Sequence, residues 1–410
     1  MFGFAVVYLA AYIYGNGLPS PAPLWPPDAI LISAPLLLSP QHWWPYLLLT
    51  LPIWMLPAFA PGIPTWLLGV NWLNDMFKAV LAAGLVRRFA PRPLGFMTLR
   101  AMGVYLACAV VVAPLLSAFM GAAGRTALGT PYWQAWRPWL LGDALANLVL
   151  TPTIVLWATA RLRPQSRQRA LEALLLGAAL LFVGVLLLLT QVALVLDNGL
   201  HYLPLPLLVW AAVRFGPRGI TSALTVVTCF AIARFAGLWG VVTSPATPRD
   251  VLSLQLFLIA TAVPLFLLAA QIEERKQEME KVQRQAEELN RVFESVADGI
   301  AVYDRDGREL RTNSALERLL RLDIAPSEYA LLSLHERMAL FAARNEQGQS
   351  LASNEGPLPR ALAGEVMAGE QAMNIRSRAF DGRELELNVS AAPLQDSDGE
   401  LVGSVCVFRD

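Results

Sequence analysis

Charged residues are scarce in this sequence. Asp, Glu, Lys and Arg make up 16% of the 410 residues, whereas the hydrophobic types make up 55%. Soluble globular chains carry roughly 25% charged residues, so this composition excludes an entirely water-soluble protein. The shortage is uneven, because residues 1–271 contain 21 charged side chains and residues 272–410 contain 43. We therefore predict a membrane-embedded part followed by one soluble domain.

Cysteine and histidine are also scarce, with three residues of each. Cys108, Cys229 and Cys406 form no CxxC or Cys/His spacing, so we interpret them as free thiols and predict no metal site. Motifs of catalysis and of nucleic-acid binding are missing too, among them the Walker loop, HExxH, GxSxG, GGDEF and the phosphoacceptor helix of a histidine kinase. We predict no catalytic residue, no enzyme activity and no nucleic-acid partner for these residues.

Long apolar runs fill residues 1–271. A helix of roughly 20 apolar residues crosses the hydrocarbon core of a bilayer, which is about 30 Å thick. The runs predict about ten spans, near residues 2–18, 28–39, 43–59, 66–86, 98–120, 138–160, 171–196, 203–214, 219–240 and 251–271. The first run opens at Met1 without a basic segment or a cleavage site, so we interpret it as a span and not as a signal peptide. The predicted fold class is a polytopic α-helical membrane bundle.

Arginine clusters give the expected orientation of this bundle. With ten spans, the clusters at residues 87–100 and 161–169 fall on the same side as Arg275 and Lys276, and three arginines fall on the other side. Cytoplasmic loops hold the excess of Lys and Arg, so both termini are predicted to be cytoplasmic. We expect a multi-pass protein of a bacterial inner membrane, with the lipid bilayer as a partner.

One predicted span carries a polar stripe. Asn71, Asn74, Asp75 and Lys78 recur at i, i+3, i+4 and i+7, so they share one helix face. Ionisable groups at membrane depth usually face the interior of a bundle and mark a function. The four residues are therefore candidates for sensing a ligand or signal. The alternative is that they hold helices together without touching a ligand.

Further candidates lie in other spans. Asp143 and Asn147 are one turn apart, and Arg234 is expected in the same leaflet as Asp143, where the two can pair. Trp25 and Asp28 begin a short, proline-bounded segment, and Leu203-Pro204-Leu205-Pro206 begins another in the same direction. Short, interrupted helices in matching positions are typical of binding sites in transporters.

Four stretches carry a family resemblance: WPPDAI, NWLNDMFKAVLAAGLVRRF, W-x-x-WLLGDALANLVLTP and LPLPLLVWAAVRFGPRG. Together they resemble the membrane-associated sensor domain of the MASE type, over most of residues 1–271. The resemblance implies a sensor that precedes a histidine kinase, diguanylate cyclase or phosphodiesterase output, with no named stimulus.

A polar segment without Gly or Pro follows at residues 272–293. A heptad pattern places apolar side chains along one seam, broken only by Arg275. The seam consists of Ile272, Met279, Ala286 and Phe293 at a, and Arg275, Val282, Leu289 and Val296 at d. This pattern predicts a short coiled coil in a parallel homodimer that transmits a signal by small helix shifts. The alternative is a single solvated helix that caps the next domain.

Residues 294–410 predict an α+β domain. Two strands, a helical middle and three antiparallel strands follow one another, with turns at Asp381-Gly382 and Asp398-Gly399. The stretches S-x-x-DGIAVYDRDGRELRTNSALERLL and PLPRALAGE and the closing FRD resemble a PAS domain. The resemblance implies relay roles for Asn313 and for Asp410, which often links such a domain to its output. The alternative for Asn313 is an ordinary residue at the start of a helix.

The cofactor of this domain stays unassigned. A flavin photosensor of the LOV class needs a reactive cysteine in a GxNCRFLQ-type helix, and nothing similar is present, so flavin is not expected. Haem is not expected either, because His335, the only histidine of the domain, lies among charged residues and is interpreted as exposed. A pocket, if open, accommodates a small apolar or anionic molecule or only relays a conformational change.

These observations predict a membrane-bound input module of a bacterial sensor. We expect the output domain to follow Asp410 in a longer protein, most often a histidine kinase of a two-component system with a response regulator as its partner, and next a diguanylate cyclase. A transporter or channel with a regulatory PAS domain is the alternative, motivated by the charged residues inside the membrane.

Overall fold

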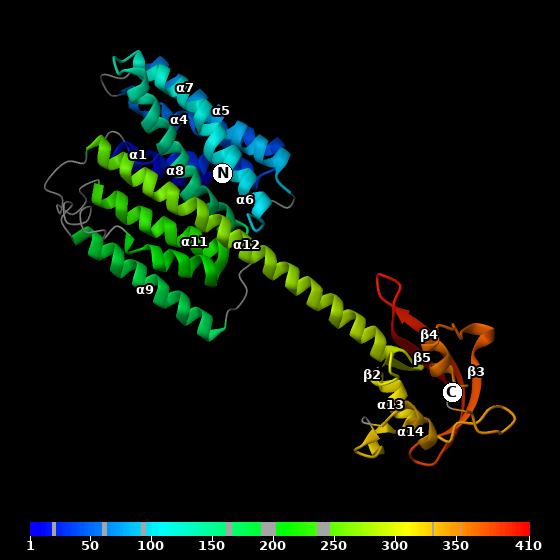
Figure 1. The fold of residues 1–410 in the computed structure, drawn as a ribbon. Helices are drawn as coiled ribbons and strands as arrows, with labels where there is room; N and C mark the ends of the chain where they lie inside the picture. Colours follow the sequence, from blue (N-terminus) through cyan, green and yellow to red (C-terminus); the bar gives the residue numbers. More distant parts are fainter. Residues whose placement is uncertain are drawn as a thin grey trace. The chain divides into compact units, whose positions relative to one another are not determined.

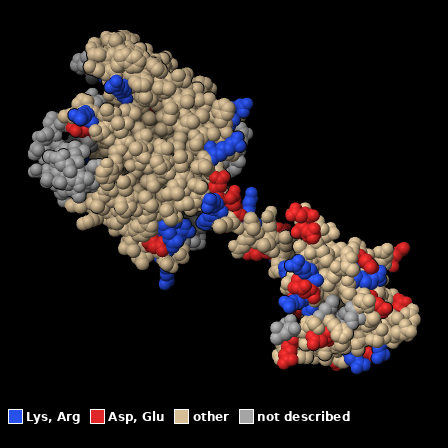
Figure 2. All heavy atoms as spheres, in the orientation of Figure 1, with Lys and Arg blue, Asp and Glu red and all other residues tan. Residues whose placement is uncertain are grey.

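The computed structural model describes residues 1–18, 22–59, 64–91, 96–160, 166–189, 202–235, 247–329, 332–352 and 354–410. The chain forms two compact units, a helical unit at Met1–Glu278 and a sheet unit at Met279–Asp410 (Figure 1). Charged side chains are sparse over the visible face of the helical unit and crowded over that of the sheet unit (Figure 2). This contrast follows the uneven distribution of charge along the sequence.

The helical unit is built from α-helices and short helical turns. Its elements are α1 (Phe2–Asn16), α2 (Pro26–Leu37), η1 (Pro40–His42), α3 (Trp43–Leu48), α4 (Leu51–Trp54), η2 (Leu56–Phe59), α5 (Thr65–Phe89), α6 (Leu99–Tyr105), the π-helix η3 (Leu106–Val112), α7 (Ala113–Thr126), α8 (Tyr132–Ala158), α9 (Arg167–Leu189), α11 (Leu205–Phe235) and α12 (Pro248–Ser295). The last of these, α12, extends into the sheet unit as one helix.

Among the described residues, five helices are long and apolar enough to cross a membrane. They are Leu99–Thr126, Tyr132–Ala158, Arg167–Leu188, Leu205–Arg234 and Pro248–Ser295, and the helices Phe2–Asn16 and Pro26–Leu37 are apolar but shorter. Helix α5 is 25 residues long and also matches an expected span, but it carries the polar stripe. The prediction of a helical membrane region is therefore confirmed.

The expected spans need one correction. The run at 43–59 is divided into α3, α4 and short turns. A proline lies at the start of α4, and a helix cannot continue through it unchanged because its ring supplies no N–H for a helical hydrogen bond. The runs at 203–214 and 219–240 correspond to the two parts of α11, which are separated by the non-helical Gly216 (φ 64°) just before Pro217. Part of the run at 171–196 lies outside the described residues.

Helix α2 lies inside the helical unit and sets the position of the site. It packs against α1, α5 and α8, and ten of its twelve residues are buried. Close approach between helices depends on small residues: a Cβ on Gly121 of α7 would lie 2.3 Å from the Trp139 ring of α8. The core of this unit is formed by apolar side chains from all the long helices.

The sheet unit contains one antiparallel sheet of five strands in the order β2-β1-β5-β4-β3. Its strands are β1 (Gly299–Asp304), β2 (Glu309–Thr312), β3 (Met373–Arg378), β4 (Glu384–Gln395) and β5 (Leu401–Arg409), and its helical elements are α13 (Ser314–Leu320), η6 (Leu322–Ile324), α14 (Leu334–Leu340), α15 (Pro357–Leu362) and η8 (Gly369–Gln371). Gly382 (φ 87°) and Gly399 (φ 85°) occupy the two expected turns. The predicted α+β domain is thus confirmed.

Candidate functional site

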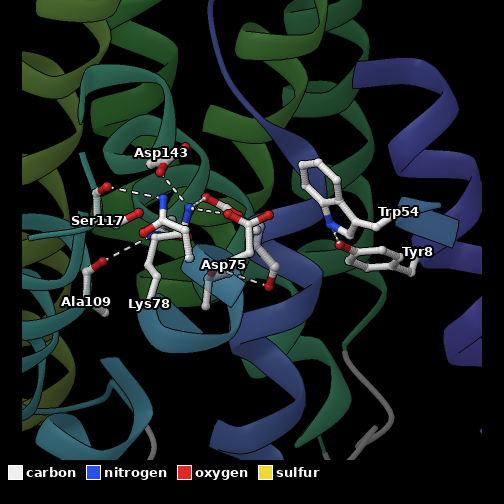
Figure 3. Close-up of polar contacts among 12 residues, drawn as sticks. Tyr8, Trp54, Asp75, Lys78, Ala109, Ser117 and Asp143 are labelled. Atoms are coloured by element: carbon white, nitrogen blue, oxygen red, sulfur yellow. Dashed lines mark hydrogen bonds and ion pairs between the residues drawn. The ribbon is translucent and has the colours of Figure 1, made fainter. Parts of the chain in front are cut away.

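A buried ion cluster lies at the centre of the helical unit. The Nζ atom of Lys78 on α5 donates to Asp28 of α2, to Asp75 one turn earlier on α5 (3.2 Å) and to Asp143 of α8 (2.5 Å) (Figure 3). All four side chains are almost fully buried, with at most 5% of any side chain exposed. The cluster therefore connects α2, α5 and α8 through one ammonium group.

The charges of this cluster do not balance. Three carboxylates around one ammonium carry two excess negative charges when all four groups are ionised. Neighbouring carboxylates that share a buried site do not all ionise freely, and desolvation of each ion costs several kcal/mol. Oδ1 of Asp28 accepts no hydrogen bond from the residues that the structure describes. The arrangement thus favours protonation of one of the three carboxylates.

The start of α2 explains why a carboxylate is tolerated at residue 28. Pro26 and Pro27 occupy the first two helical positions, where the missing N–H of proline is no loss. Asp28 lies in the first turn, where the positive end of the helix dipole stabilises a negative charge. A short helix inside the bundle therefore presents a carboxylate to Lys78.

Two buried amides flank the cluster. Nδ2 of Asn74 donates to the carbonyl of Ser117 on α7 (3.1 Å), and Nδ2 of Asn147 donates to the carbonyl of Ala109 (3.1 Å). The hydroxyl of Tyr105 donates to the carbonyl of Asn147. Oδ1 of each amide has no hydrogen-bond partner among the described residues. Asn74 thus connects α5 with α7, and Asn147 connects α8 with η3.

A π-helical turn supplies one of these acceptors. Residues 106–112 form a π-helix, in which each N–H bonds the carbonyl five residues earlier. The carbonyl of Ala109, inside this turn, accepts from Asn147. Such turns occur often at functional sites because they displace backbone groups from the regular ladder.

An aromatic group borders the cluster on the side of α1. The indole N–H of Trp54 donates to the hydroxyl of Tyr8 (3.0 Å), and the rings of Tyr12, Trp25 and Trp54 contact one another with centroids 5.3 to 6.2 Å apart. Sequence patterns identified Trp25 but missed Tyr8, Tyr12 and Trp54, because aromatic residues are common throughout this apolar sequence.

The remaining candidates in the membrane lie apart from the cluster. Asn71 is partly buried on α5 and lies near Gly124 of α7. Arg234 is partly buried and donates to the carbonyl of Leu187 on α9. The proposed pairing of Asp143 with Arg234 is wrong, because Asp143 faces α5 and binds Lys78. Among the described residues, no group of three His, Cys, Asp or Glu side chains is arranged to hold a metal ion.

In the sheet unit, Asn313 connects the end of α12 with the sheet. Its Oδ1 accepts from the amides of Ile300 (2.8 Å) and Leu316 (3.0 Å). Its Nδ2 lies 3.0 to 3.4 Å from the carbonyls of Phe293, Val296 and Asp298. The side chain is fully buried and begins α13 as its N-cap. Asn313 is therefore the N-cap of α13, and the same side chain also connects α12 with β1.

Two further contacts secure the last turns of α12. The amide and hydroxyl of Ser314 both donate to Oε2 of Glu294 (2.9 and 2.6 Å), and these hydrogen bonds hold the pKa of that carboxyl below its usual range. Arg311 of β2 donates to Asn290 and stacks on the Phe293 ring, 4.2 Å from its centroid.

The other end of the sheet unit is tied back to the same region. Arg409 pairs with Asp298 (2.7 Å), and this hydrogen-bonded guanidinium lowers the pKa of the carboxyl. Asp410 follows β5 and is exposed. The residue before β1 and the end of β5 are therefore adjacent.

Comparisons with known proteins agree with this organisation. The MASE1 family matches residues 2–276, and the PAS fold matches residues 293–410. No curated protein matches the chain.

Several solved structures match part of the chain, among them the following two. The PAS domain of an HTR-like protein from Haloarcula marismortui is 19% identical, with a TM-score of 0.25, over 33% of this chain and 98% of that one. A domain of a sensory box sensor histidine kinase/response regulator from Geobacter sulfurreducens is 22% identical, with a TM-score of 0.23, over 32% and 96%. By its sequence, the chain belongs to the MASE1 family, and a PAS domain follows its MASE1 region.

Proposed function

We propose that the chain is the input module of a bacterial sensor, in which the buried ion cluster detects a change at the membrane and α12 relays it to the PAS domain. The output is a histidine kinase that acts on a response regulator, or otherwise a diguanylate cyclase. The observation that carries this proposal is Lys78, which binds carboxylates on α2, α5 and α8 at once. A change in charge at this point alters the packing of three helices together.

The excess of carboxylates makes the cluster responsive. One ammonium can satisfy three carboxylates only when other positive charge is present, because unpaired ions are costly in a low-dielectric interior. Binding or loss of a proton therefore changes which carboxylates Lys78 holds. The site behaves as a switch when these arrangements differ in helix packing.

The relay rests on α12 and on its contacts in the sheet unit. Residues 272–293 act as a signalling linker between the membrane domain at 1–271 and the PAS domain at 294–410. Met279, Val282 and Leu289 of the expected seam are exposed by 66 to 73% in the single chain. A second copy in parallel register would cover them, which supports a homodimer with a coiled-coil linker.

This mechanism needs a defined topology. The proposed arrangement is a multi-pass protein of the inner membrane with about ten spans and with both termini in the cytoplasm. The basic clusters at residues 87–100 and 161–169 support it through the excess of Lys and Arg on cytoplasmic loops.

Photo-crosslinking in membrane vesicles tests the relay. A benzoylphenylalanine at Val282, a seam position, is expected to crosslink two copies, whereas one at Arg284, on the outer face, is not. Asp143→Asn is expected to change the crosslinking yield at Val282, while Arg125→Gln, at an exposed position on α7, leaves it unchanged. Equal yields for wild type and Asp143→Asn would contradict coupling between the cluster and the linker.

A transporter is the second candidate, and the buried ion cluster next to the short helix α2 favours it. In that case, proteoliposomes with the full chain dissipate an imposed proton or sodium gradient, and Lys78→Met abolishes the flux. The sensor proposal expects no flux above that of empty liposomes.

A further inference from the structure

One face of α12 is buried in the helical unit. Its buried residues recur at helical spacing and are Val251, Gln255, Leu258, Ala262, Leu265, Phe266, Ala269 and Ala270. Gln255 is the polar side chain among them, and it is 1% exposed. Burial of an amide without a hydrogen-bond partner is unfavourable, so the partner of Gln255 shows which part of the bundle this helix has to contact.

The partner of Gln255 belongs to the segment that leads into α2. Its Nε2 donates to the carbonyl of Pro23 (2.8 Å), shortly before α2 begins at Pro26. Pro23 and Leu24 are both buried outside any helix, so their backbone groups need partners from neighbouring elements. Gln255 supplies one of them. The hydrogen bond thereby connects α12 to the entrance of the short helix that carries Asp28.

The same segment lies against α8 beside the ion cluster. A Cβ on Gly142 would lie 3.6 Å from the carbonyl oxygen of Ala22 and 4.0 Å from Nε2 of Gln255. Asp143, the next residue of α8, binds Lys78 of the cluster. The amide of Gln255 and the segment before α2 therefore meet α8 directly beside a member of the cluster.

The cluster needs such a contact to act on α12. Its four members lie on α2, α5 and α8, whereas the signalling linker is the continuation of α12. A change in charge that repacks these three helices therefore reaches the linker through the surfaces that α12 shares with them. Gln255 binds the entrance of α2 and lies next to α8, so it joins α12 to two of the three.

A second side-chain hydrogen bond holds α12 farther along the helix. Oε2 of Glu274 accepts from the amide of Leu99 (2.8 Å), the first residue of α6. Glu274 follows Gln255 at a distance of about 28 Å along the helix axis, at a rise of about 1.5 Å per residue. A helix that is held at two such points tilts when one of them moves. A displacement of the Pro23 carbonyl is therefore passed along α12 as a change of tilt.

We propose that Gln255 is the positioning residue through which the ion cluster moves α12, by way of its hydrogen bond to Pro23. This role rests on the proposed sensor function and supplies the contact that the relay needs. When a change in charge shifts α2 against Lys78, the carbonyl of Pro23 shifts with α2 and draws α12 along. A hydrogen bond that only stabilises the bundle would instead affect stability and leave the response of the linker unchanged.

Crosslinking in membrane vesicles tests this role, with benzoylphenylalanine at Val282 of the full chain. The response is the factor by which Asp143→Asn changes the crosslinking yield. Gln255→Met is similar in length but has no donor. It is expected to reduce the response at least about twofold, because the loss of one hydrogen bond changes an equilibrium by about two- to tenfold. Gln277→Met is the matched control, since Gln277 is an exposed glutamine on the same helix, and it should leave the response unchanged.

Gln255→His separates positioning from packing. Nε2 of a neutral histidine reaches about as far as Nε2 of glutamine and can donate to the same carbonyl. At a pH of about 8 the ring is neutral, since the usual pKa of histidine is about 6.5, and this variant is expected to restore the response. Unfolding of each variant by SDS reports separately on stability.

The outcomes distinguish this role from the sensor function itself. A response that is as large in Gln255→Met as in wild type overturns the role of Gln255, and so does a Gln255→His variant that responds no better than Gln255→Met. In both cases the sensor function stands. Equal yields with and without Asp143→Asn in a chain that keeps Gln255 contradict the sensor function, and the role of Gln255 falls with it.

Discussion

Lys78 of α5 and Asp143 of α8, separated by 65 positions in the sequence, form a buried ion pair with 2.5 Å between Nζ and Oδ2. Asp28 and Asp75 bind the same ammonium. Helix packing brings these groups together from three separate segments, so the cluster is a property of the tertiary fold. The consequences of removing one member can be measured.

Lys78→Met is expected to destabilise the helical unit strongly. It leaves three carboxylates without their common counter-ion, and removing one partner of a buried ion pair costs about 3 to 5 kcal/mol. Unfolding of the full chain in mixed micelles by increasing SDS measures the loss. Arg125→Gln, which changes one charge at an exposed position on α7, is expected to have little effect. A loss below about 1 kcal/mol for Lys78→Met would show that the carboxylates are not ionised together.

A double substitution isolates the contact between Lys78 and Asp143. Combining Lys78→Met with Asp143→Asn removes one of the unpaired carboxylates. The double variant is therefore expected to lose less free energy of unfolding than the sum of the two single variants, by about 0.5 to 3 kcal/mol. The same SDS unfolding assay gives the four free energies. Arg234→Gln in place of Asp143→Asn is the control cycle, because Arg234 binds the Leu187 carbonyl on α9, and its effect is expected to add to that of Lys78→Met.

The sequence predicted only part of this site. The spacing of Asp75 and Lys78 indicated a shared helix face, because helical periodicity is local. Asp28 and Asp143 were recognised as candidates, but their common partner depends on how α2, α5 and α8 pack, which no local pattern contains. The pairing expected for Arg234 failed for the same reason.

The PAS domain was predicted more completely. Alternating strands and Asp-Gly turns are local signals, and they predicted the three closing strands, which the structure has as β3, β4 and β5. The burial of Arg337 was not predicted, because its segment shows only mixed charges and the burial results from long-range packing against β1 and β2. In the membrane region, the run at 43–59 is interrupted by short turns, because proline cannot continue a helical hydrogen-bond ladder, so hydropathy identified this region but not its division.

Asn313→Ala is expected to loosen the end of α12 from the sheet unit. The substitution removes the N-cap of α13, worth about 1 kcal/mol, and leaves backbone groups of the α12 end without a donor. Hydrogen exchange of residues 290–316 in the full chain should therefore become faster. Asn345→Ala, at a turn distant from α12, is the control, and equally slow exchange in Asn313→Ala would contradict the proposed role in relay.

The contact of Glu294 with Ser314 is expected to depend on pH. The pKa of Glu294 lies below its usual 4.5 in the folded chain, because Ser314 donates two hydrogen bonds to the ionised form. The stabilisation is therefore fully present above pH 4.5 and is lost as the pH falls through the folded pKa. Exchange of the Ser314 amide, corrected for intrinsic rate, should be faster in Glu294→Gln than in wild type at pH 7, and the difference should shrink under acidic conditions. Glu288→Gln, at an exposed position on the same helix, should show no difference at either pH.

Gly121 allows α7 and α8 to approach each other, and Gly121→Ala tests this contact. The added Cβ would lie 2.3 Å from the Trp139 ring, so one of the two helices must move. Overpacking of this kind typically costs about 1 to 3 kcal/mol in a well-packed core.

Gly84→Ala in α5 is the matched control, because its Cβ meets nothing within 4 Å, and alanine favours a helix over glycine by about 0.5 to 1 kcal/mol. SDS unfolding should therefore show a loss for Gly121→Ala and none for Gly84→Ala. A loss of equal size in both variants would mean that the approach of α7 to α8 does not depend on residue 121. Since the carbonyl of Ser117, which accepts the hydrogen bond from Asn74, lies on α7, a displaced α7 should also weaken this contact next to Lys78.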